Sequence, residues 1–406
     1  MSEFTTHEIS AEHAKTVRQT LPLVGSKIDE IAPNFYRRMF AAEPELLRDT
    51  FNRGNQAQGA QQRALAASVA TYATLLVDDR APSPDALLSR IGHKHVSLGI
   101  TEDQYQIVHD HLMAAIVEVL GADVVTAPVA EAWDAVYWSM AKTLVAFEST
   151  QYHELGVEPG DVFFTARVSE RIDRNDRIAT FTIVARDGEK PLPAFKPGQY
   201  TSVRRTMADG AGQLRQYSLC NAPGSHAWQI TVKKIDEAGS PVGEVSASII
   251  DGLKAGDELE LSLPAGDLVL DTTADNPVVL ISAGIGATPM LGMANYLSQS
   301  GSQRTVRVLH ADTDAEDAPL VDELRAAVEE MPNGSMQLWF SHHATEPALA
   351  GHMDLADQDL PEGASYYLCG SNSFLQAVRG QLAERGVDEE SIHFELFSPN
   401  DWLLPG

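Results

Sequence analysis

Cysteine is scarce in this sequence, and long apolar runs are absent. Only two of the 406 residues are cysteine, Cys220 and Cys369, and they match no metal-ligand spacing and no disulfide framework. No stretch reaches the roughly eighteen consecutive apolar residues of a membrane span. The opening residues, MSEFTTHEIS, lack the basic region and apolar run of a secretory signal. We therefore expect a soluble, reduced, cytoplasmic protein without stable membrane insertion.

Positive charge is also in short supply. Lys and Arg total 30 against 57 Asp and Glu, which gives a formal net charge of −27. Such a chain repels phosphate backbones, so we expect no nucleic-acid partner. Hydrophobic residues make up 44% of the sequence, enough to fold, and the length allows about two to four domains.

The first third has the apolar spacing of helices. Apolar residues recur every three or four positions, and Ser83-Pro84 and the Thr101/Gln104 pair are typical helix starts. We expect about six or seven helices here and no strand. The apolar runs include Val17, Leu21, Val24, Ile28, Ile31 and Phe35; Leu65, Val69, Tyr72 and Leu76; Tyr105, Val108, Leu112, Ile116 and Val119; and Trp133, Val136, Met140, Leu144 and Phe147.

His95 is the residue on which the function of this third depends. It shares one helix face with Leu87, Leu88 and Ile91. A lone histidine on an apolar face is more often a core residue that is hydrogen-bonded to a carbonyl. Ligation of a haem iron is the alternative, and this window alone does not favour it.

Several segments together resemble a bacterial globin, specifically the globin domain of flavohaemoglobins. They are NFYRRMF (34–40), TFNRGNQ (50–56), KHVSLGI (94–100) and the helix over 133–148. The resemblance implies that His95 is the iron ligand of haem b. It further implies a distal pair, Tyr36 and Gln61; pocket walls, Phe51 and Leu65; and partners of the His95 ring, Tyr105 and Glu148.

The chemistry of these residue types agrees with the implied roles. A Tyr36 hydroxyl directed at bound oxygen would stabilise its partial negative charge. A Glu148 carboxylate that accepts from the His95 ring would make the imidazole a stronger donor to iron. The alternatives are a core aromatic for Tyr36 and a solvated residue near a helix end for Glu148.

After residues 154–160, whose sequence ELGVEPG predicts a linker, the apolar period changes to two. No long helix pattern intervenes, so we expect a small closed antiparallel barrel. The predicted strands cover 161–172, 178–186, 200–206, 227–235 and 257–263, with a further strand around RQYS (215–218).

Taken alone, RQYS indicates only a strand with one buried tyrosine. Together with KPGQY (196–200) and PAGD (264–267), it resembles the flavin domain of the ferredoxin–NADP reductase family. The resemblance implies an FAD site in which an arginine clamps the pyrophosphate, a tyrosine lies on the isoalloxazine ring, and a serine bonds near its reactive nitrogen. The residues concerned are Arg215, Tyr217 and Ser218, with Gln216 between Arg215 and Tyr217. Tyr200 would pack on the adenine-side portion of the cofactor or line its groove, and residues 243–246 would begin a short helix near phosphate.

From Asn276 onward, strands and helices alternate, which predicts a parallel, doubly wound sheet. The segment ISAGIGATPML matches the nicotinamide motif of the same reductase family, and YLCG (367–370) matches its second motif, with Ser371 where the family usually has proline. A buried strand residue is the alternative for Cys369. The implied nucleotide-binding residues are Gly284, Ile285, Gly286, Ala287, Thr288, Pro289, Cys369 and Gly370.

The C-terminal segment LFSP follows Glu395 and includes the aromatic residue that closes over the flavin in this family. Lys94 and Glu395 are expected to flank the haem–flavin junction, and Asp312 and Asp314 favour NADH over NADPH, because carboxylates repel a 2′-phosphate. The C-terminal cofactor-binding residues are Glu395, Leu396, Phe397, Ser398 and Pro399.

The whole sequence thus resembles a flavohaemoglobin. We expect a multidomain protein: an all-α globin (1–153), a linker (154–160), an antiparallel β-barrel FAD domain (161–270) and an α/β parallel-sheet nicotinamide-binding domain (271–406). The resemblance implies a monomeric nitric oxide dioxygenase with haem, FAD and NADH or NADPH, acting on O2 and NO. A gas-binding or gas-sensing globin, or a flavin reductase for an external acceptor such as a peroxide or quinone, are the alternatives.

Overall fold

The computed structural model describes residues 8–57, 60–78, 83–236, 242–318 and 320–397. The chain divides into two compact units, and each is described by itself. The first holds the described residues up to Phe163 together with Arg204–Leu214, and the second holds Phe164–Val203 and the described residues from Arg215 to Phe397.

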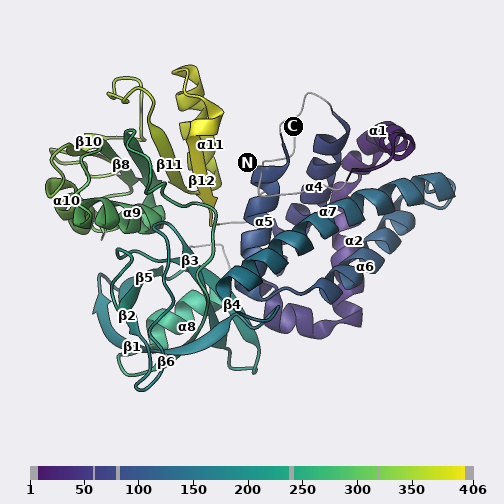
Figure 1. Cartoon of the computed structure of the whole chain (residues 1–406), viewed down its shortest axis with the longest axis horizontal. Helices are drawn as coiled ribbons and strands as arrows, with labels where there is room; N and C mark the ends of the chain where they lie inside the picture. Colours follow the sequence, from purple (N-terminus) through teal and green to yellow (C-terminus); the bar gives the residue numbers. More distant parts are fainter. Residues whose placement is uncertain (1–7, 58–59, 79–82, 237–241, 319, 398–406) are drawn as a thin grey trace. The chain divides into compact units, whose positions relative to one another are not determined.

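The N-terminal part of the first unit is helical throughout, as predicted (Figure 1). Pro22 and Pro33 lie inside the first two helices, and a short π-helical turn follows the second. The helices are α1 (Ala11–Ser26), α2 (Ile28–Ala42), η1 (Leu46–Thr50), α3 (Arg53–Ala57), α4 (Ala60–Val77), α5 (Asp85–Leu98), α6 (Glu102–Leu120) and α7 (Ala127–Leu155).

The helix ends follow from local chemistry. The Ser10 side chain accepts a hydrogen bond from the His13 backbone N–H, 3.1 Å away, and so caps α1. Thr101 and Gln104 form the predicted capping box of α6. Gly99 ends α5 with φ 70°, a left-handed conformation that glycine adopts without steric cost. These ends set where α5 stops and α6 begins, and so they place His95 in the last turn of α5, close to the start of α6.

The second part of the chain forms an antiparallel sheet with strand order β4-β3-β6-β1-β2-β5. Leu219, just after β4, bridges Ile230 of β5, so the two ends of the sheet approach each other as in a barrel. The predicted short helix is present as α8 (Glu244–Gly252). The strands are β1 (Phe163–Asp173), β2 (Ile178–Val184), β3 (Tyr200–Thr206), β4 (Gly212–Ser218), β5 (Ala227–Lys233) and β6 (Glu258–Ser262).

The last third is the predicted parallel sheet, with strand order β10-β9-β8-β7-β11-β12. The two-residue strand β10 at its edge was not predicted. The elements are β7 (Val278–Ala283), η2 (Gly284–Gly286), α9 (Ala287–Gln299), β8 (Val306–Asp312), α10 (Val321–Glu329), β9 (Gly334–Phe340), β10 (Leu349–Ala350), β11 (Ser365–Gly370), α11 (Asn372–Glu384), η3 (Glu389–Ser391) and β12 (Ile392–Leu396).

Alternate residues of these strands face opposite layers of helices. Val278 and Leu280 pack with α9 and α10, whereas Val279 and Ile281 pack with α11 (Figure 1). The strand order reverses beside β7, where a parallel sheet usually binds its ligand. Among the described residues, no helix is both long and apolar enough to cross a membrane.

Candidate functional site

Three side chains from three helices, His95, Tyr105 and Glu148, meet in one cluster. Nδ1 of His95 lies 2.8 Å from Oε1 of Glu148 and 2.9 Å from the hydroxyl oxygen of Tyr105. The Tyr105 hydroxyl donates to the same Glu148 oxygen at 2.5 Å. Glu148 is 2% exposed, so this proximal cluster (His95, Tyr105 and Glu148) is shielded from water on the Glu148 side.

Protonation in the proximal cluster follows from burial and charge. Desolvation, and then the Glu148 carboxylate, hold the pKa of the Tyr105 hydroxyl far above its usual range. Tyr105 therefore stays protonated and can only donate to Glu148. Because the Glu148 oxygen offers an acceptor to Nδ1 of His95, a neutral ring that donates from Nδ1 keeps its lone pair on Nε2. That lone pair is what a metal ligand needs.

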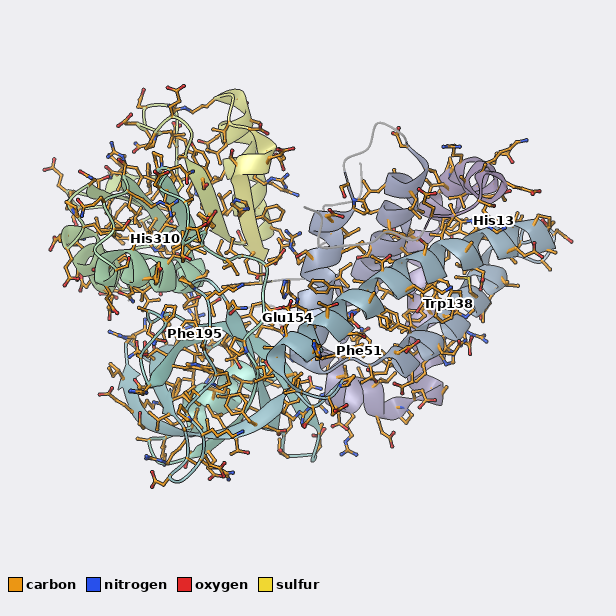
Figure 2. The ribbon with its side chains drawn as sticks, viewed as in Figure 1. His13, Phe51, Trp138, Glu154, Phe195 and His310 are labelled. Atoms are coloured by element: carbon orange, nitrogen blue, oxygen red, sulfur yellow. The ribbon has the colours of Figure 1, made fainter. Side chains whose placement is uncertain are left out.

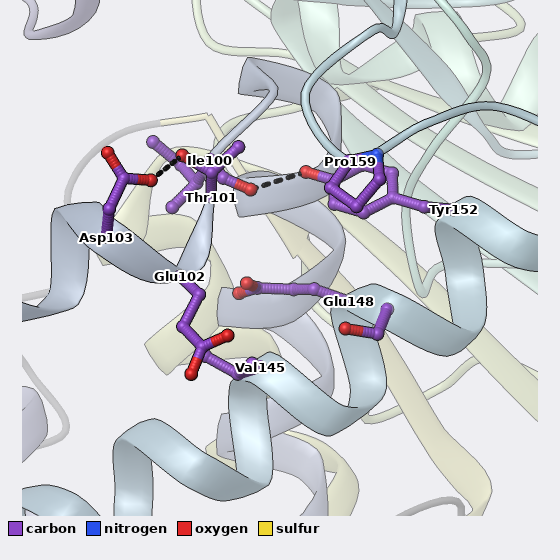
Figure 3. A pocket seen from close by; sticks show the side chains of 9 residues that line it. Ile100, Thr101, Glu102, Asp103, Val145, Glu148, Tyr152 and Pro159 are labelled. Carbon is purple, nitrogen blue, oxygen red and sulfur yellow. Dashed lines mark hydrogen bonds between the residues drawn. The ribbon is translucent and has the colours of Figure 1, made fainter.

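A pocket of about 500 Å³ lies next to Glu148. Figure 3 shows the Glu148 side chain extending toward the segment that bears Thr101 and Glu102, and Tyr152 donates from its hydroxyl to the Ile100 carbonyl at 2.7 Å. Glu148 therefore both lines this pocket and contacts the His95 ring.

Tyr36, in α2, belongs to a second candidate group, an aromatic cluster with Phe40 and Phe51. Its ring centroid is 5.8 Å from that of Phe51 and 5.4 Å from that of Phe40; Phe51 is labelled in Figure 2. Burial holds the pKa of the Tyr36 hydroxyl well above its usual range, and the nearby polar Gln56 side chain partly opposes that shift. The hydroxyl is therefore a protonated donor inside the helical unit.

Among the described glutamines, Gln56, in α3, lies near the Tyr36 hydroxyl and was not selected from the sequence. The residue selected instead, Gln61, lies in α4, but its side chain is outside the described part of the chain. Gln56 is the last residue of the TFNRGNQ segment, so its position in a motif was the only available signal. Of the other predicted haem-side residues, Leu65 packs against the core of the helical unit and Lys94 is exposed.

The predicted flavin residues lie on β3 and β4. Tyr200 is buried, and a Cβ at Gly266 would come within 3.0 Å of its ring, so only glycine allows this approach. Gln216 donates from Nε2 to the Ser202 hydroxyl at 3.1 Å. Ser218 is buried, whereas Arg215 and Tyr217 are half-buried, and their roles at FAD stay predictions.

The turn between β7 and α9 is shaped by its backbone. Gly284 has φ 55°, and a Cβ at Gly286 would lie 2.4 Å from the carbonyl oxygen of Cys369 at the end of β11. The turn therefore passes directly over the end of β11, and Ile285, Ala287 and the buried Thr288 and Pro289 follow this path into α9. The two predicted nicotinamide motifs, GIGATP and YLCG, thus lie side by side.

Ser371, where the reductase family usually has proline, has a structural role. Its hydroxyl accepts from the Phe374 backbone N–H at 3.3 Å and caps α11. Beside it, a Cβ at Gly370 would lie 2.6 Å from the Phe374 ring. The departure from the family pattern therefore replaces a rigid residue with a helix cap.

Cys369 is fully buried, and its desolvation, followed by the charge of Glu395, holds the pKa of its thiol well above the usual range. It is therefore not a reactive thiolate. Glu395 is buried and accepts from the Leu396 backbone N–H at 2.9 Å. Phe397 is exposed, and Ser398 and Pro399 are outside the described residues.

The two carboxylates expected to select NADH have partners within the protein. The Asp312 side chain is 5% exposed, and one of its oxygens lies 3.7 Å from Nε2 of His310. Nδ1 of that histidine, which is labelled in Figure 2, lies 2.9 Å from the Ser282 hydroxyl oxygen. Asp314 accepts from the backbone N–H groups of Glu316 and Asp317 at 2.9 and 3.0 Å. The preference for NADH stays a prediction.

Known proteins match this chain along nearly its whole length. Residues 33–144 match the globin family, and residues 280–380 match the oxidoreductase NAD-binding domain family. The flavohemoprotein of Chromobacterium violaceum is 38% identical over 404 residues, which cover 96% of this chain and 98% of the relative. The chain belongs to the flavohaemoglobin family. Membership makes it an oxidoreductase in which a globin and a reductase share one polypeptide.

Other flavohaemoglobins also match this chain over most of its length. The flavohemoprotein of Bordetella parapertussis is 37% identical over 402 residues, covering 96% of this chain and 98% of its own. The crystal structure of flavohemoglobin from Malassezia yamatoensis, with bound FAD and heme, is 31% identical, has a TM-score of 0.87, and covers 97% of this chain and 100% of that one. The FAD/NAD-binding domain of nitric oxide dioxygenase from Vibrio cholerae is 34% identical with a TM-score of 0.54, covering 58% of this chain and 98% of that domain.

Proposed function

We propose that this flavohaemoglobin is a nitric oxide dioxygenase, which uses NADH or NADPH to oxidise NO with O2 to nitrate. The observation that carries the proposal is the proximal cluster, in which Glu148 and Tyr105 hold Nδ1 of His95. A carboxylate on the ring N–H makes an imidazole a stronger donor to iron, and this favours oxygen activation over reversible storage.

The residues of the helical unit fit a haem. Nδ1 of His95 is engaged, so Nε2 is the atom that would bind the iron. Tyr36 offers a protonated hydroxyl in an aromatic setting, with Phe51 and Leu65 as apolar wall residues. The Tyr36 donor, with Gln56 or Gln61 beside it, would stabilise negative charge that develops on a gas molecule.

The second unit has features that fit FAD and a nicotinamide nucleotide. Arg215 would bind the FAD pyrophosphate, and Tyr217 and Ser218 would lie along the isoalloxazine ring. The absence of side chains at Gly284 and Gly286 would let a second pyrophosphate approach the start of α9. When bound, the flavin accepts a hydride and passes electrons on singly, and the haem supplies an iron that binds gases.

The named relatives support this proposal. The Malassezia yamatoensis protein carries FAD and heme, and the Vibrio cholerae relative is named a nitric oxide dioxygenase. We extend both properties to this chain because the residues described above match what each group requires.

The test is the amount of nitrate formed per NADH consumed. Each NO that combines with O2 to give nitrate takes up one electron, and NADH supplies two, so the ratio should be about two. The purified protein, loaded with haem and FAD, would be given limiting NADH in aerated buffer with an NO donor.

The two alternatives give different results in this test. A gas-sensing globin would form at most about one nitrate per haem, because its iron stays oxidised without electrons from NADH. A reductase for an external acceptor would form little nitrate, and its NADH consumption would rise when a peroxide or quinone is added. Either result would contradict the proposal.

A further inference from the structure

The segment from η1 to the start of α3, residues 46–53, carries one wall residue of the proposed haem pocket on the side of Tyr36, which we call the distal pocket. Phe51 lies in this segment, and its ring packs against Tyr36 and Phe40. The segment itself is only a five-residue π-helical turn followed by an extended residue at Phe51. So short a turn leaves backbone carbonyls without helical partners, and donors from elsewhere must satisfy them.

Those donors come from residues 204–214, which belong to the same compact unit as the helices and which we call the distal hairpin. Gln213 is fully buried, and its Nε2 lies 2.8 Å from the carbonyl oxygen of Arg48, 3.3 Å from that of Leu47 and 3.2 Å from that of Phe51. Its Oε1 accepts from the Arg53 backbone N–H at 3.4 Å. One amide thus reaches the backbone at four positions of the segment.

The geometry suits a primary amide specifically. An amide group offers two N–H donors and a carbonyl acceptor from one plane. Nε2 carries two N–H groups and lies within 3.3 Å of three carbonyl oxygens, so at least one N–H must be shared, as in other bifurcated bonds. A carboxylate of the same shape would turn an acceptor toward three acceptors.

Surface contacts accompany the buried amide. The Gly212 backbone N–H donates to Asp49 at 2.8 Å, and Arg53 pairs with Asp209 at 2.5 Å. Hydrogen bonds from Arg53 and then from the Ala211 backbone lower the pKa of the Asp209 carboxyl. Asp209 is largely exposed, so water and salt screen this pair and the buried Gln213 dominates.

We infer that Gln213 is a positioning residue of the distal pocket. It holds the backbone of residues 47–53 so that Phe51 stays against Tyr36, and it touches no substrate itself. β4 continues from Gln213 to Arg215 and Tyr217. The strand proposed to bind FAD therefore also carries the residue that holds residues 47–53 of the helical unit. The inference rests on the proposed function only in assigning Phe51 and Tyr36 to that pocket.

The test compares Gln213→Met with Gln229→Met in the full-length protein carrying haem and FAD. Methionine keeps the length and approximate volume of glutamine but donates no hydrogen bond. Gln229 is the matched control, because it lies in β5 of the same sheet and its amide donates to Thr182 at 3.3 Å rather than to the globin segment.

Two readouts are expected to change in Gln213→Met alone. Hydrogen exchange of backbone amides 46–57 should speed up about tenfold or more, because buried carbonyls lose their donors. The C–O stretching band of the ferrous CO complex should shift or broaden, since this band reports the Tyr36 hydroxyl near the bound gas. Reduction of an artificial one-electron acceptor by NADH should stay within about twofold of wild type.

A second variant, Gln213→Glu, covers the case in which the methionine variant does not fold, because it keeps the length and branching of the side chain and replaces its donors with an acceptor that the three carbonyls repel. Exchange and CO bands equal to those of Gln229→Met in whichever variant folds would overturn the inference. So would faster exchange throughout α1–α7, which would indicate general destabilisation. Neither readout involves NO turnover, so a failed nitrate test would leave this result standing.

Discussion

The proximal cluster and the nicotinamide turn solve the same problem by opposite means. Around His95, the functional geometry comes from side chains on α5, α6 and α7 that meet in one buried network. Around Gly286, it comes from missing side chains, because the turn and the end of β11 approach to a distance that leaves no space for a Cβ. One site is built by hydrogen bonds and the other by backbone approach.

This difference predicts which changes each site tolerates. A side-chain network can lose a charge and keep its shape, so its function should decline in steps. A backbone crossing cannot accommodate an added methyl group without moving, so a small addition should affect it strongly. The two kinds of site therefore call for different variants.

The largest effect is expected for His95→Ala. Removing the only side chain whose Nε2 we assign to the iron should abolish stable haem binding and the Soret band. The second unit should still oxidise NADH with an artificial acceptor. Absorption spectra and acceptor assays of the purified variant measure both. Unchanged haem uptake would show that another residue is the ligand.

Gly286→Ala tests the backbone-built site. The new Cβ would meet the Cys369 carbonyl oxygen at 2.4 Å, which should cost about 3 kcal/mol and lower the rate of flavin reduction by NADH. Stopped-flow flavin bleaching measures that rate.

Gly380→Ala is the matched control. Gly380 is exposed to solvent within α11, and a Cβ there would meet no neighbouring atom within 4 Å. It should stabilise the helix by about 0.5–1 kcal/mol. Equal hydride-transfer rates for the two variants would contradict a backbone-built site.

Glu148→Gln should have an intermediate effect. The amide keeps the shape of the proximal cluster but removes the charge that faces Nδ1 of His95. We expect a loss of about tenfold or more in nitrate formation and a raised haem reduction potential, with haem retained. Glu154→Gln, on the exposed part of α7, should behave as wild type. A potential equal to wild type in Glu148→Gln would remove the carboxylate from the mechanism.

The smallest effect concerns Tyr137, whose hydroxyl donates to the Tyr105 carbonyl at 2.6 Å. Burial, and then the charge of Asp110, raise the pKa of this hydroxyl well above its usual value. At pH 7 both folded and unfolded chains keep the proton, so Tyr137→Phe should lose about 1 kcal/mol of unfolding free energy through the lost hydrogen bond.

Above about pH 10 the unfolded tyrosine ionises while the folded one does not. Wild type should then lose up to about 1.4 kcal/mol per pH unit more than the variant, so the gap should close as pH rises. Denaturant unfolding followed by the helical circular dichroism signal at both pH values measures this. A gap that widens with pH would mean that the folded tyrosine ionises first.

Sequence reasoning succeeded where the signal is local. The helical period of the first third and the alternation after Asn276 predicted the helices and the parallel sheet, and Thr101 and Gln104 predicted the start of α6. It was less accurate where tertiary packing decides. α7 reaches Leu155, two residues into the predicted linker, and the edge strand β10 has no periodic signal in its two residues.

The candidate residues divide in the same way. The motif order alone pointed to His95, Tyr105 and Glu148, and the structure brings these three together, although their catalytic roles stay predictions. Gln213 had no such signal, because it is one glutamine at the start of a strand. Its importance depends on carbonyl groups about 160 residues earlier in the chain.

The sequence by itself determined the order of a helical globin, a flavin-type barrel and a parallel nucleotide-binding sheet, because apolar periodicity, turn residues and glycine motifs act over a few neighbouring positions. Only the tertiary structure decided that Gln56 lies near the Tyr36 hydroxyl, and that Gln213 holds the backbone near Phe51. The physical reason is that a buried amide must find its hydrogen-bond partners wherever the fold brings them, and spacing along the chain does not reveal that place.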